Sequence, residues 1–391
     1  MVNYGTGSNG DRIVSTNETE TLSFMDYKNL TVESGATLTV PARTRLQVSD
    51  TLTINGTIVV QNDISGGGGS GNGGNSGGNL AVVAKTIAGN GTVKVNGEDG
   101  DSVTNDGNGS SGSSGAGYGI PSGASGNQSG GGQQGRESSR DNENGNTGYN
   151  NNAGTAYSGG SMYSDGQLKQ YFEDYLISGA YITQSPMDIL LPGSGGGGGG
   201  GGYESFYPTT NSNYSAYRAN VGGGGGGAGG SFVTAGGYGG GAGSNRFDGN
   251  NVDDSNSTQN HRVYGGDGGA GGGSGGFILI ATENMSTDIT WEAMGGDGGD
   301  GYIGRLQHDG NNYNAYTKRA DIAGGGGGGG SGGALIAFTD KTPTAVLDKG
   351  VAGKDGTEVF DGTYEGNAGS SDGTDGNPGV MFTFDIEELK N

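Results

Sequence analysis

Apolar and polar residues alternate with a period of two along residues 22–60. Alternation of this kind places successive side chains on opposite faces of a β-strand. Turn-compatible residues separate the short strands, and Asn55-Gly56 favours a hairpin or tight turn. The pattern predicts short strands at regular spacing, assembled as a β-solenoid or a small β-sandwich. The predicted inward-facing pairs are Leu30/Val32, Leu38/Val40, Leu46/Val48, Leu52/Ile54 and Ile58/Val60.

A second strand pattern occurs three times, and each copy begins with Ser-Gly-Gly. The copies occupy residues 76–100, 274–298 and 331–356. Each contains an apolar strand, a polar turn, a second strand and a closing Asp-Gly, at nearly constant spacing. Such self-similarity indicates a single supersecondary unit, which we interpret as a β-hairpin. Because each unit alone would expose an apolar face, we expect the units to stack on one another or beside residues 22–60.

Long runs of glycine adjoin these units. They are Gly195–Gly202, Gly222–Gly227, Gly236–Gly243, Gly265–Gly276, Gly295–Gly301 and Gly324–Gly333, with few interruptions. Flexible linkers are one interpretation, but linkers have no reason to recur at similar lengths. A glycine helix with three residues per turn has no Cβ on any side, so several can pack closely together. We therefore favour packed polyglycine-II helices, which the β units align because ordering glycine is costly.

These patterns divide the chain into four parts. We expect residues 1–64 to form an N-terminal β domain for attachment or docking, and residues 65–101 to form the first glycine-rich β unit. Residues 102–192 read as a polar insertion with one short helix over 165–178, where apolar residues follow a helical period. Residues 193–391 form a polyglycine scaffold with exposed loops and two further β units. The fold class that follows is mainly β.

Composition and charge then limit the classes of function. The 391 residues include 95 glycines and 7 prolines, and 29% are hydrophobic, so a core depends on the clustered apolar positions. The formal charge of −22 disfavours nucleic acid as a partner, because binding it requires a cationic surface. The absence of cysteine excludes disulfides and thiol catalysis. No apolar run reaches 18 residues, so we expect no membrane insertion.

The first residues, MVNYGTGSNGDRIV, lack the basic and apolar regions of a secretion signal. The composition is nevertheless that of a surface protein. A virion protein satisfies both observations, because it assembles inside the cell and leaves by lysis. We therefore expect an extracellular protein of the virion, with an exported protein that has lost its signal as the alternative.

The alternation of glycine runs with aromatic and polar segments resembles the distal tail-fibre adhesins of tailed bacteriophages. The resemblance covers roughly residues 190–380 and depends on this pattern. It implies a polyglycine-II sandwich whose tip loops contact a receptor on the host surface, either a protein or a glycan. The other implied partners are virion tail or fibre proteins, with a homo-oligomer left open.

The segments between the glycine runs contain the candidate receptor contacts. Residues 203–221, 244–264 and 302–323 combine Tyr, Asn, Ser and Gly with Arg, which gives rigid amphipathic contact area and adaptable hydrogen bonding. The alternative is that these aromatic residues cap the ends of the glycine scaffold. The predicted receptor-binding residues are Tyr203, Phe206, Tyr207, Tyr214, Tyr217, Arg218, Phe247, Arg262, Tyr302, Arg305, Tyr313, Tyr316 and Arg319.

We expect no catalytic residues and no cofactor. His261 and His308 are the only histidines, and we interpret them as loop residues rather than a metal or acid–base pair. Asp297 and Asp300, and likewise Asp99 and Asp101, could bind structural calcium, but Asp-Gly turns explain them equally well. Two alternatives to an adhesin stay open. One is a decoration protein of the capsid or tail without a receptor. The other is a β-solenoid polysaccharide depolymerase that uses a carboxylate pair, for which Asp253/Asp254 and Glu173/Asp174 are the adjacent acidic residues.

Overall fold

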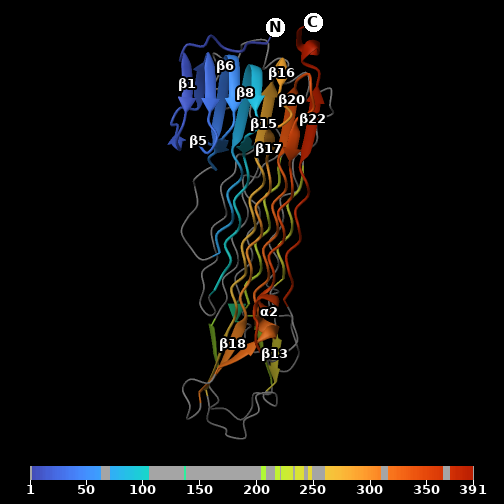
Figure 1. The fold of residues 1–391 in the computed structure, drawn as a ribbon. Helices are drawn as coiled ribbons and strands as arrows, with labels where there is room; N and C mark the ends of the chain where they lie inside the picture. Colours follow the sequence, from blue (N-terminus) through green and yellow to red (C-terminus); the bar gives the residue numbers. More distant parts are fainter. Residues whose placement is uncertain are drawn as a thin grey trace.

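The computed structural model is elongated and mainly β (Figure 1). A body of parallel sheets lies at one end with both termini, glycine-rich segments run along the middle, and small sheets lie at the other end. In the described part of the chain, helix is confined to α2 (Gly356–Val359), η2 (Ala320–Ile322) and η3 (Ile386–Lys390). The described residues are 2–62, 71–104, 136–137, 204–207, 216–220, 222–231, 234–241, 245–248, 260–309, 316–363 and 370–390.

Two parallel sheets form the body. The nine-stranded sheet has the order β1-β4-β6-β8-β15-β20-β22, and β3 and β16 pair with β6 and β8. Its strands are β1 (Asp11–Val14), β3 (Phe24–Tyr27), β4 (Asn29–Val32), β6 (Arg43–Ile54), β8 (Asn79–Gly89), β15 (Phe277–Ala281), β16 (Asn284–Met285), β20 (Ala334–Phe338) and β22 (Val380–Phe384). The six-stranded sheet has the order β2-β5-β7-β9-β17-β21. Its strands are β2 (Glu18–Thr19), β5 (Thr37–Val40), β7 (Thr57–Val60), β9 (Thr92–Lys94), β17 (Thr290–Glu292) and β21 (Thr344–Val346).

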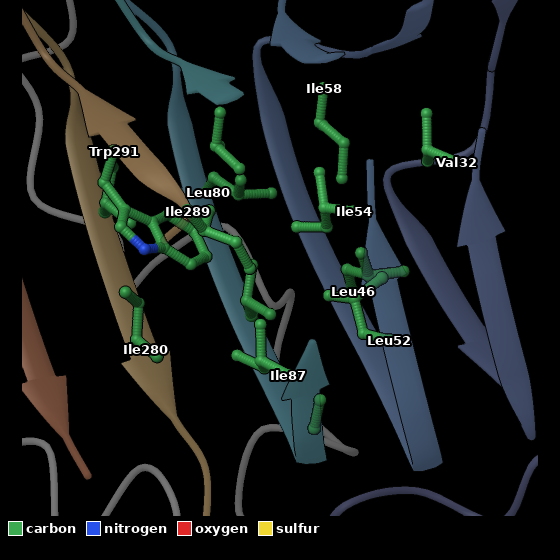
Figure 2. Close-up of a cluster of buried hydrophobic side chains, with 14 of the residues drawn as sticks. Val32, Leu46, Leu52, Ile54, Ile58, Leu80, Ile87, Ile280, Ile289 and Trp291 are labelled. Carbon is green, nitrogen blue, oxygen red and sulfur yellow. The ribbon is translucent and has the colours of Figure 1, made fainter. Parts of the chain in front are cut away.

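The chain alternates between these two sheets, and their facing sides enclose the main core. All ten predicted inward-facing residues between Leu30 and Val60 are buried in this core, which confirms that prediction. Figure 2 shows Ile54, Leu80 and Ile280 of the larger sheet gathered in this core with Ile58 and Trp291 of the smaller one. Trp291 is fully buried. Because β6 pairs with β8, the larger sheet continues across the predicted boundary at residue 64.

The prediction that each Ser-Gly-Gly unit is a β-hairpin is wrong. The first strand of each unit lies in the nine-stranded sheet and the second in the six-stranded sheet. Equivalent strands of different units pair in parallel, so Phe277 is the partner of both Asn79 and Ala334. Both strands of a unit contribute inward-facing residues to the same core, and this requires two facing sheets rather than one hairpin. The turn at Asn55-Gly56 likewise connects strands of different sheets.

The N-terminal segment is fixed to the body by Asp26. Its carboxylate accepts hydrogen bonds from the Thr6 hydroxyl at 2.6 Å, the Gly7 N–H at 2.9 Å and the Ser8 hydroxyl at 3.1 Å. Burial alone would raise the pKa of Asp26, but the hydrogen bonds from these residues outweigh it and lower the pKa. These bonds hold the N-terminal residues against the body, at the end of the molecule where the N-terminus lies (Figure 1).

The glycine-rich segments continue directly from the strands of the body. We call them the glycine block, which consists of residues 71–78, 95–103, 222–231, 235–241, 265–276, 293–301, 323–333, 347–356 and 370–379. Neighbouring segments are joined by backbone hydrogen bonds at every third residue. The N–H groups of Gly223, Gly226 and Gly229 donate to the carbonyls of Gly266, Gly269 and Gly272, each at 2.9 Å.

Successive residues of one segment bond to different neighbours. The carbonyl of Gly269 accepts from Gly226, that of Ala270 from Gly299, and that of Gly271 from Gly74. A segment in the middle of the block therefore has neighbours on all three sides. Because the hydrogen bonds recur at every third residue, each segment can be divided into triplets. Residues at the same position in successive triplets face the same neighbouring segment.

A triplet contains more glycines when more of its sides are covered by neighbouring segments. A Cβ added at Gly326, Gly327 or Gly328 would lie closer than 3.0 Å to a backbone oxygen of a different neighbouring segment in each case. The triplet Gly295-Gly296-Asp297 has two such covered positions, and its aspartate is exposed. Glycine therefore occupies most of the covered positions, although Ala228, Ala270 and Asp267 are also buried in the block, and exposed residues such as Asp297 lie on the open side.

Alanine substitution tests this rule. We expect Gly327→Ala to lower the free energy of unfolding by about 3 kcal/mol or more, because its Cβ would collide with the carbonyl of Ala270. Gly241→Ala is the matched control, since its Cβ would meet only the Ser371 hydroxyl at 3.7 Å. Chemical denaturation measures both, and equal effects of the two substitutions would contradict the rule.

Candidate binding site at the far end of the glycine block

Two antiparallel sheets lie at the end of the glycine block opposite the termini, where β13 and β18 are labelled in Figure 1. We call these two sheets the tip. The four-stranded sheet has the order β11 (Glu204–Tyr207), β14 (Asn260–Tyr264), β18 (Gly304–Asp309) and β19 (Tyr316–Arg319). The three-stranded sheet has the order β10 (Arg136–Glu137), β12 (Ala216–Asn220) and β13 (Asn245–Asp248).

The base of the four-stranded sheet is packed onto the glycine block. Tyr264 is buried where β14 joins Gly265, and the guanidinium carbon of Arg305 lies 4.2 Å from the centre of its ring. This cation–π contact connects register partners on neighbouring strands. Ile303 and Ile322 are also buried here. Tyr264 therefore caps the block, which is the alternative role considered for the aromatic residues.

Most of the predicted receptor-binding residues lie in tip strands. Tyr302 is half-buried just before β18, and its backbone bonds to Asp267 and Gly324 of the block. Three predicted residues, Tyr203, Tyr214 and Tyr313, lie outside the described residues, as does the predicted helix over 165–178. Those in tip strands are Phe206, Tyr207, Tyr217, Arg218, Phe247, Arg262, Arg305, Tyr316 and Arg319.

The strand register brings residues from distant parts of the sequence together. Phe206 of β11 is the partner of Arg262, and Tyr217 of β12 is the partner of Phe247. Arg262 is also the partner of Gln307, which in turn pairs with Tyr316. Directly opposite residues of an antiparallel pair lie on the same face of the sheet. The register thus places aromatic, basic and amide residues in adjacent rows, together with the acidic residues Glu204, opposite Tyr264, and Asp248, opposite Ala216.

The prediction of loops between the glycine runs is corrected in part, because these segments contain paired strands. His261 and His308, interpreted as loop residues, are direct partners on β14 and β18. Their strands alternate apolar and polar residues, as in Arg262-Val263-Tyr264, so the signal was present but short. The candidate segments also contain Arg246 and Lys318, which were left out of the predicted receptor-binding residues and lie in β13 and β19. Sequence reasoning missed the strand at Arg136, which lies inside the predicted polar insertion.

The acidic residues considered for calcium accept backbone hydrogen bonds across the surface of the block. Asp99 accepts from the Asp297 N–H at 2.7 Å, Asp297 accepts from the Val351 N–H at 2.8 Å, and Asp300 accepts from the Lys354 N–H at 2.8 Å. These carboxylates thus satisfy backbone donors that face outward from the block. Within the described ranges, no group of three or more metal-ligating side chains could hold an ion.

Comparison with known protein families, curated proteins and solved structures finds no match. Among the residues that the structure describes, no helix has the length and apolar character needed to cross a bilayer.

Removing the Tyr264 ring tests how the tip is anchored. We expect Tyr264→Ala to speed tryptic cleavage at Arg305, Lys318 and Arg319 roughly 5- to 30-fold, because one or two kcal/mol of local stability is lost. Peptide mass spectrometry over time measures the rate. The control is Tyr238→Ala, which removes a 58% exposed ring from the block. Unchanged cleavage in Tyr264→Ala would contradict the anchoring role.

Proposed function

We propose that this chain is a non-catalytic adhesin at the distal end of a viral tail fibre or spike, which binds a receptor on the host surface. One observation supports the proposal most strongly. The strands that contain the candidate contact residues assemble at the end of the molecule farthest from both termini (Figure 1). That polarity suits a protein with attachment at one end and recognition at the other.

We further propose that the glycine block is a bundle of polyglycine-II helices and that the body is a β-solenoid. The hydrogen bonds recur at every third residue and join different segments, as expected for a helix with three residues per turn and no internal bonds. Solenoid geometry is supported by the chain's alternation between two parallel sheets. A bundle of this kind would hold the tip at a fixed distance from the body.

The proposed mechanism requires only binding. The body attaches to other virion tail or fibre proteins, and the aromatic and basic residues of the tip contact the receptor. Tyr and Arg are the residue types that dominate binding energy in protein interfaces. We propose an extracellular location on the virion, with no cofactor. The adjacent carboxylates Asp253/Asp254 and Glu173/Asp174, which suggested a depolymerase, lie outside the described residues.

Competition for adsorption tests the adhesin. Purified protein, incubated with host cells first, should reduce adsorption of particles that carry this chain. We expect the double substitution Tyr217→Ser and Phe247→Ser to weaken that competition about tenfold or more without affecting particle assembly. Tyr238→Ala again serves as the control and should compete like the unmodified protein.

Three outcomes would contradict the proposed adhesin or its proposed binding surface. Particles that lack the chain but adsorb normally would indicate a decoration protein. Release of reducing sugar from host envelope polysaccharide would indicate a depolymerase. Full competition by the double variant would show that this part of the tip does not bind the receptor.

A further inference from the structure

Three segments of the glycine block connect the tip directly to the body. Residues 265–276 run from the end of β14 to the start of β15, and residues 293–301 run from the end of β17 to just before β18. Residues 323–333 run from η2, which follows β19, to the start of β20. Each segment crosses the block from one end to the other (Figure 1). A pull on the tip relative to the body therefore acts along the backbone of all three segments.

Residues 323–333 are held by neighbouring segments on every side. All ten N–H groups from Gly324 to Gly333 donate to backbone carbonyls outside the segment, at 2.7–3.2 Å. Carbonyls of the same segment accept further bonds, such as that of Gly325 from Gly269. The six neighbours are the segments 222–231, 235–241, 265–276, 293–301, 347–356 and 370–379. Because these bonds run sideways between segments, a pull along the block loads many of them together, and the segment cannot slide until they break at once.

The proposed polyglycine-II geometry also leaves these segments little room to lengthen. Each residue of such a helix rises about 3.1 Å, whereas a fully stretched chain reaches at most about 3.3–3.6 Å per residue. The eleven residues 323–333 can therefore lengthen by only about 2–6 Å before their backbone is taut. A flexible glycine-rich chain of eleven residues has an end-to-end distance of only about 17–20 Å and extends readily when it is pulled. The block is thus already close to its maximum length.

We propose that the glycine block has a mechanical function, which is to transmit tension between the tip and the body with almost no change in length. Several backbone segments share the load, and the hydrogen bonds between them keep any one segment from being drawn out alone. The inference goes beyond the proposed function, because it depends on the path of the chain through the block and not on what the tip binds.

The body responds differently to a pull across its strands. In the nine-stranded sheet the strands lie side by side, from β1 at one edge to β22 at the other. A pull between these edges opens the hydrogen bonds of one strand pair before the next pair is loaded. The outermost pairs are short, since β1 and β4 are paired over four residues and β20 and β22 over five. We therefore expect the molecule to yield at a lower force in this direction.

Single-molecule pulling in two directions tests the inference. The chain has no cysteine, so two introduced cysteines define where the force acts. Asp50→Cys in the body, combined with Asn312→Cys between β18 and β19 in the sequence, pulls along the block. Asp11→Cys in β1, combined with Thr383→Cys in β22, pulls across the sheet. Asp11, Asp50 and Thr383 are exposed, which suits them to the attachment of handles.

Unfolding along the block should require at least about twice the force needed across the sheet at the same loading rate, because forced unfolding follows the barrier in the pulled direction. Both cysteine pairs probe the same folded state, so a difference in force reports the direction of pulling and not the free energy of unfolding. Equal forces in the two directions, or a lower force along the block, would overturn the inference.

Alanine substitution shows whether the block itself bears the load. In the folded Gly327→Ala variant, whose Cβ would collide with the carbonyl of Ala270, we expect a lower force along the block and an unchanged force across the sheet. Gly241→Ala is the matched control and should change neither force, because its Cβ would meet only the Ser371 hydroxyl. An unchanged force along the block in folded Gly327→Ala would contradict the proposal. If that variant does not fold, the comparison of the two directions decides.

Comparison with the adsorption experiment identifies which proposal fails. If the unmodified protein does not compete for adsorption but resists force along the block, the adhesin is overturned and the mechanical function stands. If it competes but yields at equal force in both directions, the adhesin stands and the mechanical function is overturned.

Discussion

The structure depends on backbone hydrogen bonds between the segments of the glycine block. These segments approach so closely because most of their residues are glycine and have no Cβ. Gly326, Gly327 and Gly328 each lie against the backbone of a different neighbour, closer than any side chain would allow. Glycine loses more conformational freedom on ordering than any other residue, and one hydrogen bond returns only about 0.5–1.5 kcal/mol. The block therefore needs a partner that fixes its register before its own bonds form.

The body is that partner. The N–H groups of Phe277, Ala334 and Val380, the first residues of β15, β20 and β22, donate to Gly78, Gly276 and Gly333 of adjacent segments. The ladder of the larger sheet thus continues into the block without a break. Carboxylates such as Asp297 satisfy outward-facing amides at the surface, which also leaves fewer free donors for contact with another copy. A body with an ordinary hydrophobic core thereby aligns the long glycine block. The strands of the tip continue from the end of the block opposite the body.

The period-two pattern predicted which residues face the core, as Leu38 and Ile54 show, but not which strands pair. Apolar and polar residues alternate in the same way whether two strands form a hairpin or lie in two facing sheets. The pattern therefore could not distinguish the two arrangements, and the hairpin interpretation was wrong. A further strand equivalent to the first strand of each unit, β22, follows Asn377-Pro378-Gly379 and escaped notice because no Ser-Gly-Gly precedes it. At the tip, the sequence identified the segments with candidate contacts. The pairing of Arg218 with Arg246 could not be predicted, because a long glycine-rich segment separates the two strands and nothing in it fixes their register.

Amide hydrogen exchange of the glycine segments tests the central claim most directly. If the block is an ordered scaffold continuous with the body, the amides of residues 323–333 will exchange as slowly as those of β15 and β20, because all open in one cooperative unit. Exchange of those glycine amides at the rate of an unstructured chain would show that they are linkers, and would contradict the account.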